Sequence, residues 1–162
     1  MDEHIERTFV ALKPDTVRRG IMGEILTTFE EAGFKVIGMK MVWADEEILQ
    51  EHYSEHVDKD FYDRLEEYMS SGPVVAMVLE GVNAVKNVRK IVGETDPREA
   101  SPATIRGRFA HMSFAHADES GSLHKNIIHA SAEPEEAEEE IEIWFDEEEL
   151  HSYDQPREKD LR

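Results

Sequence analysis

The sequence predicts a single α+β domain in which helices pack against a four-stranded antiparallel sheet. Two observations predict this class. Short apolar runs alternate with segments of helical periodicity, and turn residues separate the two kinds of segment. The chain has 162 residues, which is the size of one domain, so residues 1–162 are treated as a single unit.

The first half of the chain predicts two strands and three helices. Pro14, Gly33 and the Ser71-Gly72-Pro73 turn separate them. In order, these are a strand over 8–12, one amphipathic helix over 17–29 closed by Gly33, a strand over 34–42, a helix over 45–53 capped by Asp45, and a helix over 60–69.

The second half predicts two more strands, two helices and a long ordered loop. The elements are a strand over 74–79, a helix over 83–92 stopped by Gly93, a loop over 94–108, a strand within 126–130, a helix over 134–145, and a polar tail over 151–162. The order βαββαβ, with helices on one face of the sheet, is that of a ferredoxin-like α+β fold. Long loops inside compact domains are usually functional.

Composition excludes several classes of function. Asp and Glu outnumber Lys and Arg by 37 to 18, which gives a formal net charge of −19. Such a surface repels phosphate backbones, so nucleic acid is an unlikely partner. The chain has no cysteine, so a reducing cytoplasm is the expected location. No apolar run of membrane-spanning length and no secretory signal is present, so no membrane association is expected.

The acidic residues lie on predicted helix faces as well as in the tail, for example at residues 135–142. This distribution favours a folded protein adapted to high salt, because screening removes the repulsion between surface carboxylates. The alternative is an acidic protein without such adaptation. The net charge is far larger than solubility requires, which favours the salt-adapted interpretation.

The segment Asn126-Ile-Ile-His129-Ala-Ser131 contains the candidate nucleophile. An apolar run ends in His129, and an amphipathic helix begins at Pro134. Neutral imidazole is nucleophilic at neutral pH because its ordinary pKa is about 6.5. Glu140 lies at the flank of that helix's apolar stripe, whereas Glu138, Glu139 and Glu142 are expected on its solvated face. The alternative is a histidine that is simply satisfied at a strand end.

One metal motif matches the sequence. His52-Tyr53-Ser54-Glu55-His56 fits the H-x-x-E-H pattern of inverted zinc proteases. We interpret the match as chance, since no long helix follows to supply a further ligand. Both histidines are expected to be solvated helix residues, and no protein-held metal is predicted.

Three cationic residues have unusual placements in so acidic a chain. Lys13 ends a buried strand, Arg89 lies on a helix among valines, and Arg106 lies in the proline-bearing loop. Each alone could be a structural ion-pair partner. Together with a nucleophile, they provide the fixed positive charge that phosphoryl transfer needs.

Six short pieces occur in order and resemble one family, nucleoside diphosphate kinase. They are Arg7-Thr-Phe-Val-Ala-Leu-Lys-Pro-Asp15, Arg19-Gly20, Gly72-Pro-Val-Val-Ala76, Gly93-Glu-Thr-Asp-Pro97, Thr104-Ile-Arg-Gly107 and Asn126-Ile-Ile-His-Ala-Ser131. The resemblance runs from about Arg7 to Leu150. It implies transfer of the γ-phosphate from a nucleoside triphosphate to a nucleoside diphosphate by a ping-pong mechanism through a phosphohistidine on His129.

The resemblance also implies roles for other residues. Mg²⁺ would be held through nucleotide phosphates and water, and the chains would assemble as a hexamer or a tetramer built from dimers, with residues 34–42 as the candidate edge strand. The implied site residues are Lys13, Arg89, Thr95 and Arg106 for the phosphates, Asn126 for the sugar, Phe61 and Leu65 for the base, Tyr53 beside the nucleophile, and Glu140 with Ser131 to orient His129.

The chain departs from the family pattern in two places. Ala130 and Ala132 flank Ser131, where the family commonly has glycine and a Ser-Asp pair. Residues 110–125 form an insertion about the length of a short hairpin that resembles archaeal members, so the second base-clamping residue is left open between Phe114 and Leu123. A regulatory nucleotide-binding protein on the same fold is the alternative function, and the complete set of site residues favours the enzyme.

Overall fold

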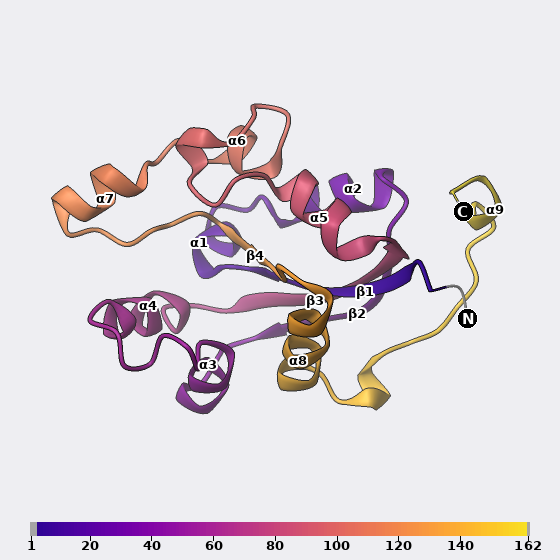
Figure 1. The fold of residues 1–162 in the computed structure, drawn as a ribbon, viewed down its shortest axis with the longest axis horizontal. Helices are drawn as coiled ribbons and strands as arrows, with labels where there is room; N and C mark the ends of the chain where they lie inside the picture. The colour runs from indigo at the N-terminus through magenta and orange to yellow at the C-terminus, as the bar shows by residue number, and fades with distance from the viewer. Residues whose placement is uncertain (1–2, 162) are drawn as a thin grey trace.

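The computed structural model describes residues 3–161, and one antiparallel sheet of four strands lies at its centre (Figure 1). The strand order is β2-β3-β1-β4. The central strands are β1 (Ile5–Leu12) and β3 (Val74–Val82), and the edges are β2 (Lys35–Val42) and β4 (Ile128–Ala130). This topology confirms the predicted ferredoxin-like fold and the edge position of the second strand.

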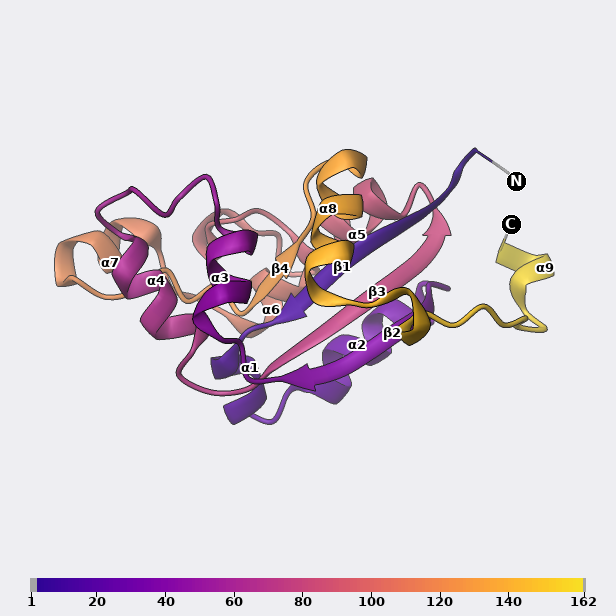
Figure 2. The ribbon, with the colours of Figure 1, turned by 90° about the horizontal axis from the view of Figure 1, so that it is seen from below.

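Helices cover both faces of the sheet, so the expectation of helices on one face was wrong. Val10 and Leu12 of β1 belong to one apolar core, and Phe9 and Ala11 belong to the other. Both faces of β1 are therefore buried over residues 9–12, which explains why this part of the strand is continuously apolar. Figures 1 and 2 show one pair of helices on each side of the sheet. The pairs are α2 (Met22–Glu31) with α5 (Ala84–Val92), and α3 (Glu46–His52) with α8 (Pro134–Trp144).

Two predicted segments divide differently in the structure. The helix expected over 17–29 is two helices, α1 (Pro14–Arg18) and α2, because Gly20 between them adopts a left-handed conformation with φ of 69°. The loop expected over 94–108 contains a 3₁₀ turn, η1 (Pro97–Glu99), and a short helix, α6 (Ile105–Phe109). Both elements are too short to give a periodic pattern.

The insertion at 110–125 folds as a helix, α7 (Phe114–Ser120), between flanking loops. The Ser113 hydroxyl caps it by accepting from the His116 N–H at 3.1 Å, and Gly121 ends it with φ of 69°. Across from it lies α4 (Tyr62–Met69), and an Arg64 guanidinium nitrogen donates to the Gly121 carbonyl at 3.2 Å. The insertion therefore forms a wall opposite α4.

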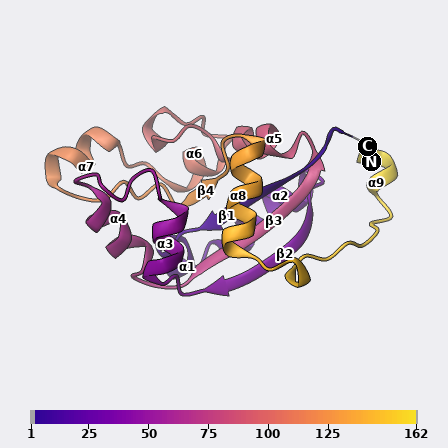
Figure 3. The ribbon, with the colours of Figure 1, turned by 60° about the horizontal axis from the view of Figure 1, so that its bottom comes forward.

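The acidic tail returns to the edge of the sheet after α8. The His151 N–H donates to the Ile37 carbonyl at 2.7 Å, and the Tyr153 hydroxyl donates to the Val36 carbonyl at 2.6 Å. The tail includes a 3₁₀ turn, η2 (Glu147–Glu149), and ends in α9 (Glu158–Leu161), at the opposite end of the molecule from α7 (Figure 3). None of the described helices has the length and apolar character needed to cross a membrane.

Candidate active site

His129 lies in the middle of β4, paired with Ala11 of β1. Ile127 and Ile128 before it are buried, and Ile127 has φ of 65°, a costly conformation for a β-branched residue. The Ile127 carbonyl accepts from the Lys13 N–H at 2.9 Å and from the Thr16 hydroxyl at 2.6 Å. Two fixed hydrogen bonds therefore hold the backbone just before His129 in place.

Glu140 orients the His129 ring. Its Oε2 lies 2.6 Å from His129 Nε2, and its Oε1 accepts from the Ser131 hydroxyl at 2.6 Å. Glu140 is only 4 % exposed, whereas Glu138, Glu139 and Glu142 are exposed, as the helical spacing predicted. Both carboxylate oxygens are thus engaged, and the imidazole is held in one orientation.

The hydrogen bond to Glu140 decides which nitrogen can react. Because a carboxylate accepts, His129 Nε2 carries the ring proton and Nδ1 keeps its lone pair. Nδ1 makes no hydrogen bond to any described residue. Burial and then Lys13 lower the pKa of His129 below its ordinary value, so the ring is neutral at neutral pH. The geometry therefore presents a neutral imidazole with a free Nδ1.

His52 belongs to this cluster, and the expectation that it is solvated was wrong. Its side chain is 2 % exposed, and its Nδ1 lies 3.1 Å from Trp144 Nε1 and 3.2 Å from Glu140 Oε2. Burial and the neighbouring His129 lower the pKa of His52 to about 3, so it is also neutral. His56 is half-buried beside Tyr53 and Phe61, and so is not simply solvated either.

The zinc motif is not assembled in the structure. Among the described residues, one group of possible ligands converges, formed by His52, His129 and Glu140, and it lacks Glu55 and His56 of the motif. Two ligands of one tetrahedral zinc, each about 2.05 Å from the metal, would be roughly 3.3 Å apart. The 2.6 Å contact between His129 and Glu140 is instead that of a charge-assisted hydrogen bond.

Three cations surround β4, as the sequence suggested. The Lys13 ammonium donates to Asn126 Oδ1 at 2.6 Å, and Arg89 donates to the Ala130 carbonyl at 3.1 Å. Arg106 is 3 % exposed and donates to the carbonyls of Gly93, Asn126 and Ile128 at 3.1, 3.3 and 2.6 Å. The segment that carries the nucleophile is therefore bordered by fixed positive charge.

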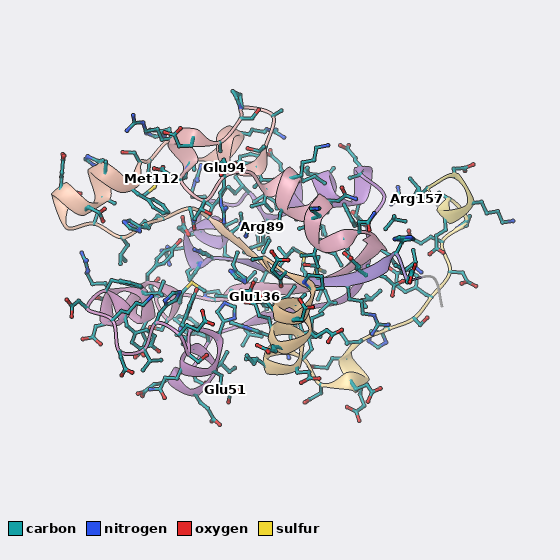
Figure 4. The ribbon with its side chains drawn as sticks, in the orientation of Figure 1. Glu51, Arg89, Glu94, Met112, Glu136 and Arg157 are labelled. Atoms are coloured by element: carbon teal, nitrogen blue, oxygen red, sulfur yellow. The ribbon has the colours of Figure 1, made fainter. Side chains whose placement is uncertain are left out.

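The buried cations act on one another. Burial, with Arg106 as the next cause, lowers the pKa of Lys13 to about 7. Burial and Arg89 lower the pKa of Arg106 to about 10, and Glu94 opposes that shift. In the view of Figure 4, Arg89 lies between Glu94 and Glu136. Cations that depress one another's pKa in this way are stabilised by a bound anion, so their cluster near His129 is a candidate anion site.

Comparison with known proteins gives the family. The nucleoside diphosphate kinase family model matches residues 6–150. The chain belongs to the nucleoside diphosphate kinase family. A nucleoside diphosphate kinase of Natronomonas pharaonis is 49 % identical over 150 residues, covering 92 % of both chains. It follows that the chain is an enzyme, a phosphotransferase that moves the γ-phosphate of a nucleoside triphosphate to a nucleoside diphosphate.

Solved nucleoside diphosphate kinases share the fold over nearly the whole chain. The Borrelia burgdorferi enzyme, a transition-state mimic with vanadate and ADP, has a TM-score of 0.92 at 37 % identity, covering 98 % of this chain and 97 % of its own. A halophilic enzyme from Halobacterium salinarum in complex with CDP has a TM-score of 0.88 at 42 % identity, covering 98 % and 99 %.

A cavity of about 320 Å³ lies between α4 and the insertion of this kinase. Phe61 and Leu65 line one wall, and Leu123 and His124 line the other. Phe114 does not line this cavity, because its ring stacks on that of His124 with centroids 4.0 Å apart. The structure therefore favours Leu123 over Phe114 as the apolar residue opposite Phe61.

The remaining predicted site residues are Asn126, Thr95 and Tyr53. The Asn126 amide is buried, and its Nδ2 donates to the Thr95 carbonyl at 3.0 Å. Thr95 itself is exposed beside this contact. The Tyr53 ring stands edge-on to His52, with centroids 4.6 Å apart, and burial followed by Glu140 raises the pKa of Tyr53. The structure therefore brings Asn126 to Thr95 and Tyr53 to His52, a residue that the sequence analysis did not include in the site.

Proposed function

We propose that the transfer is a ping-pong reaction through a phosphohistidine on His129. Nδ1 would attack the γ-phosphorus, and the bond from that phosphorus to the β,γ-bridging oxygen would break. The nucleoside diphosphate leaves with the bond's electron pair, and a second diphosphate then takes the phosphoryl group by the reverse step. The observation that carries the proposal is the 2.6 Å contact of His129 Nε2 with Glu140, which leaves Nδ1 as the reactive atom.

Glu140 and Ser131 would stabilise the charge that develops on the ring. As Nδ1 bonds to phosphorus, the imidazole gains positive charge, and its Nε2–H bond to the carboxylate becomes stronger. Ser131 holds the other carboxylate oxygen at 2.6 Å, so Glu140 need not reorganise during the step. Tyr53, half-buried beside His52, would limit access of water to the nucleophile.

The cations would bind the polyphosphate, and the cavity would bind the base. Lys13, Arg89 and Arg106 border β4, and Thr95 lies next to Asn126. Phe61, Leu65 and Leu123 are apolar, so they would pack on the face of the base without reading its edge, which permits broad nucleotide use. Asn126, fixed by Lys13 and Thr95, would contact the sugar from between these two regions.

Mg²⁺ would enter with the nucleotide and be held by phosphate oxygens and water. The described residues contain one convergent group of possible ligands, and its His129 and Glu140 atoms are hydrogen-bonded to each other. The site therefore fits a metal–nucleotide complex better than a protein-held metal. When bound, Mg²⁺ would neutralise charge on the transferring phosphate.

We further propose a salt-adapted, archaeal-type cytoplasmic hexamer. The net charge of −19 and the exposed acids of α8 support salt adaptation, and a halophilic relative shares the fold. Met39, Met41 and Trp43, at the end of edge strand β2 and just beyond it, are 55 %, 56 % and 65 % exposed, which supports pairing with a second copy at this edge. The domain would comprise residues 1–162, with the insertion as a wall of the nucleotide site.

The test is to incubate the protein with γ-labelled ATP and Mg²⁺ without an acceptor. His129 should carry a phosphate that is labile in acid and stable in alkali, and adding a nucleoside diphosphate should remove it. His129→Ala should lose both label and exchange while still binding nucleotide. His111→Ala is the matched control and should keep the label, since His111 is exposed and does not line the cavity. Label on another histidine would refute the assignment.

A further inference from the structure

His52 is the buried polar group that the proposed mechanism does not use. It is the last residue of α3, and its ring lies among those of Phe9, Tyr53, His129 and Trp144, with centroids 5.9, 4.6, 4.6 and 5.6 Å away. Its side chain is 2 % exposed. An imidazole in this position needs a reason, because burying a polar ring costs free energy unless its nitrogens have partners.

The hydrogen bond from Trp144 supplies a partner. Indole Nε1–H can only donate, and it donates to His52 Nδ1 at 3.1 Å. His52 Nδ1 is therefore an acceptor, and its ring proton is on Nε2. Glu140 Oε2 lies 3.2 Å from the same nitrogen, so the carboxylate and the indole N–H both approach His52 Nδ1. Trp144 and Glu140 are both on α8, one helical turn apart.

If the acceptor at position 52 is removed, the indole N–H of Trp144 would compete with His129 for Glu140. A buried indole N–H without an acceptor is costly, so it would turn to Glu140 Oε2. That oxygen already receives His129 Nε2–H at 2.6 Å. A second donor on this oxygen would draw the carboxylate away from His129 and weaken its response to charge on the ring.

We propose that His52 is a positioning residue that accepts the Trp144 N–H and thereby reserves the Glu140 carboxylate for His129 and Ser131. Its role rests on the proposed phosphohistidine mechanism, since it acts only through Glu140. The low pKa of His52 fits this role, because a protonated ring would donate to Glu140 instead of accepting from Trp144. Residues that orient a metal ligand through a hydrogen bond typically contribute 10- to 100-fold to metal affinity or activity, and we expect an effect on the same scale here.

Four variants separate this role from simple packing. His52→Phe keeps an aromatic ring and removes the acceptor, so the rate of His129 phosphorylation should fall by about 10- to 100-fold. His52→Asn places an amide oxygen near the Nδ1 position and should stay within a few-fold of wild type. In His52→Phe/Trp144→Phe the indole donor is also absent, so the loss from His52→Phe should largely disappear relative to Trp144→Phe alone.

The experiment measures single-turnover phosphorylation of His129 by rapid quench and ADP affinity by calorimetry. Nuclear magnetic resonance of the His129 Nε2–H proton reports its bond to Glu140, and this signal should shift in His52→Phe and be restored in the double variant. ADP affinity should be unchanged throughout. Wild-type protein that is not labelled on His129 would refute the proposed mechanism itself. If wild-type His129 is labelled but the rate losses of His52→Phe and Trp144→Phe simply add in the double variant, the positioning role alone is refuted.

Discussion

Replacing Glu140 by Gln tests the charge of the site while preserving its shape. The amide can still accept from His129 Nε2 through its oxygen, across a contact that is now 2.6 Å. It cannot balance the positive charge that forms when Nδ1 attacks phosphorus. Because this interaction strengthens only in the transition state, kcat and kcat/KM should fall together while nucleotide affinity stays nearly constant.

The magnitude follows from the distance and the burial. Two full charges about 4 Å apart interact by about 4 kcal/mol at an effective dielectric constant near 20, and the ring carries less than a full charge in the transition state. The extra strength of a charge-assisted over a neutral hydrogen bond, about 1.5 kcal/mol, gives the lower bound. Since about 1.4 kcal/mol is tenfold in rate, the loss should lie between roughly tenfold and a thousandfold.

Rapid-quench transfer from γ-labelled ATP, at the salt concentration where the protein is stable, measures this loss. Glu139→Gln is the matched control, because Glu139 is the neighbouring residue on the exposed face of α8 and should show almost no change. Equal rates for the two variants would show that Glu140 does not act on His129. A loss confined to KM would show that it acts on nucleotide binding instead.

Glu140→Gln should slow phosphate transfer but should not lower the stability of the fold. Burial raises the pKa of Glu140, against the effects of His52 and Ser131. A carboxyl group with a raised pKa binds more protons in the folded state than in the unfolded state, so folding stability falls as pH rises through that interval. The cost is fully present only once the pH exceeds the pKa that Glu140 has in the folded state. Glu140→Gln should therefore melt at the same or a higher temperature than wild type while transferring phosphate more slowly.

Three further outcomes are expected. Because the pKa of Lys13 is lowered to about 7, nucleotide affinity should weaken as pH rises through neutrality. In calorimetric titrations Lys13→Arg should lose that pH dependence, because its guanidinium stays charged. Equal pH profiles for the two proteins would contradict this. The melting temperature should rise steeply between about 0.1 and 1 M salt, over which the Debye length shrinks from about 10 to about 3 Å, and a flat profile would argue against salt adaptation. Met41→Glu on the exposed edge of β2 should lower the assembled mass measured by light scattering. Val57→Glu is the control, because Val57 is 37 % exposed and lies outside β2, and it should not change the mass. Equal masses for both variants and wild type would exclude this edge as the interface.

The sequence predicted those parts of the fold in which the pattern is long enough to repeat. The strands of the central sheet and α8 follow from apolar runs and helical spacing, and that spacing also placed Glu140 inside and Glu139 outside. The elements that were predicted wrongly involve only a few residues each. A single left-handed residue, Gly20, divides the first helical segment, and the five residues of α6 cannot show a period.

His52 could not be predicted for a different reason. It ends the seven-residue α3 and is followed by Tyr53 and Ser54, so nothing in its neighbourhood marks it as buried. Its burial depends on α8, which brings Trp144 and Glu140 to it from 88 or more positions away in the chain. Contacts of that kind are set by how helices dock on the sheet, and local spacing carries no information about docking.

The site therefore depends both on a contact between residues close in sequence and on contacts made by helix packing, and mutations should distinguish the two. The pair of His129 and Glu140 spans 11 positions, joined by one turn and the start of one helix, so the helical spacing placed Glu140 near the core and the family resemblance supplied its role. The link from Glu140 through Trp144 to His52 exists only when α3 and α8 pack on the same face of the sheet, against Phe9. A change that loosens this packing, such as Leu49→Ala on the buried face of α3, should thus slow phosphorylation of His129 although Leu49 is not one of the proposed site residues. It follows that the chemistry of the nucleophile depends on the second core as well as on its own motif.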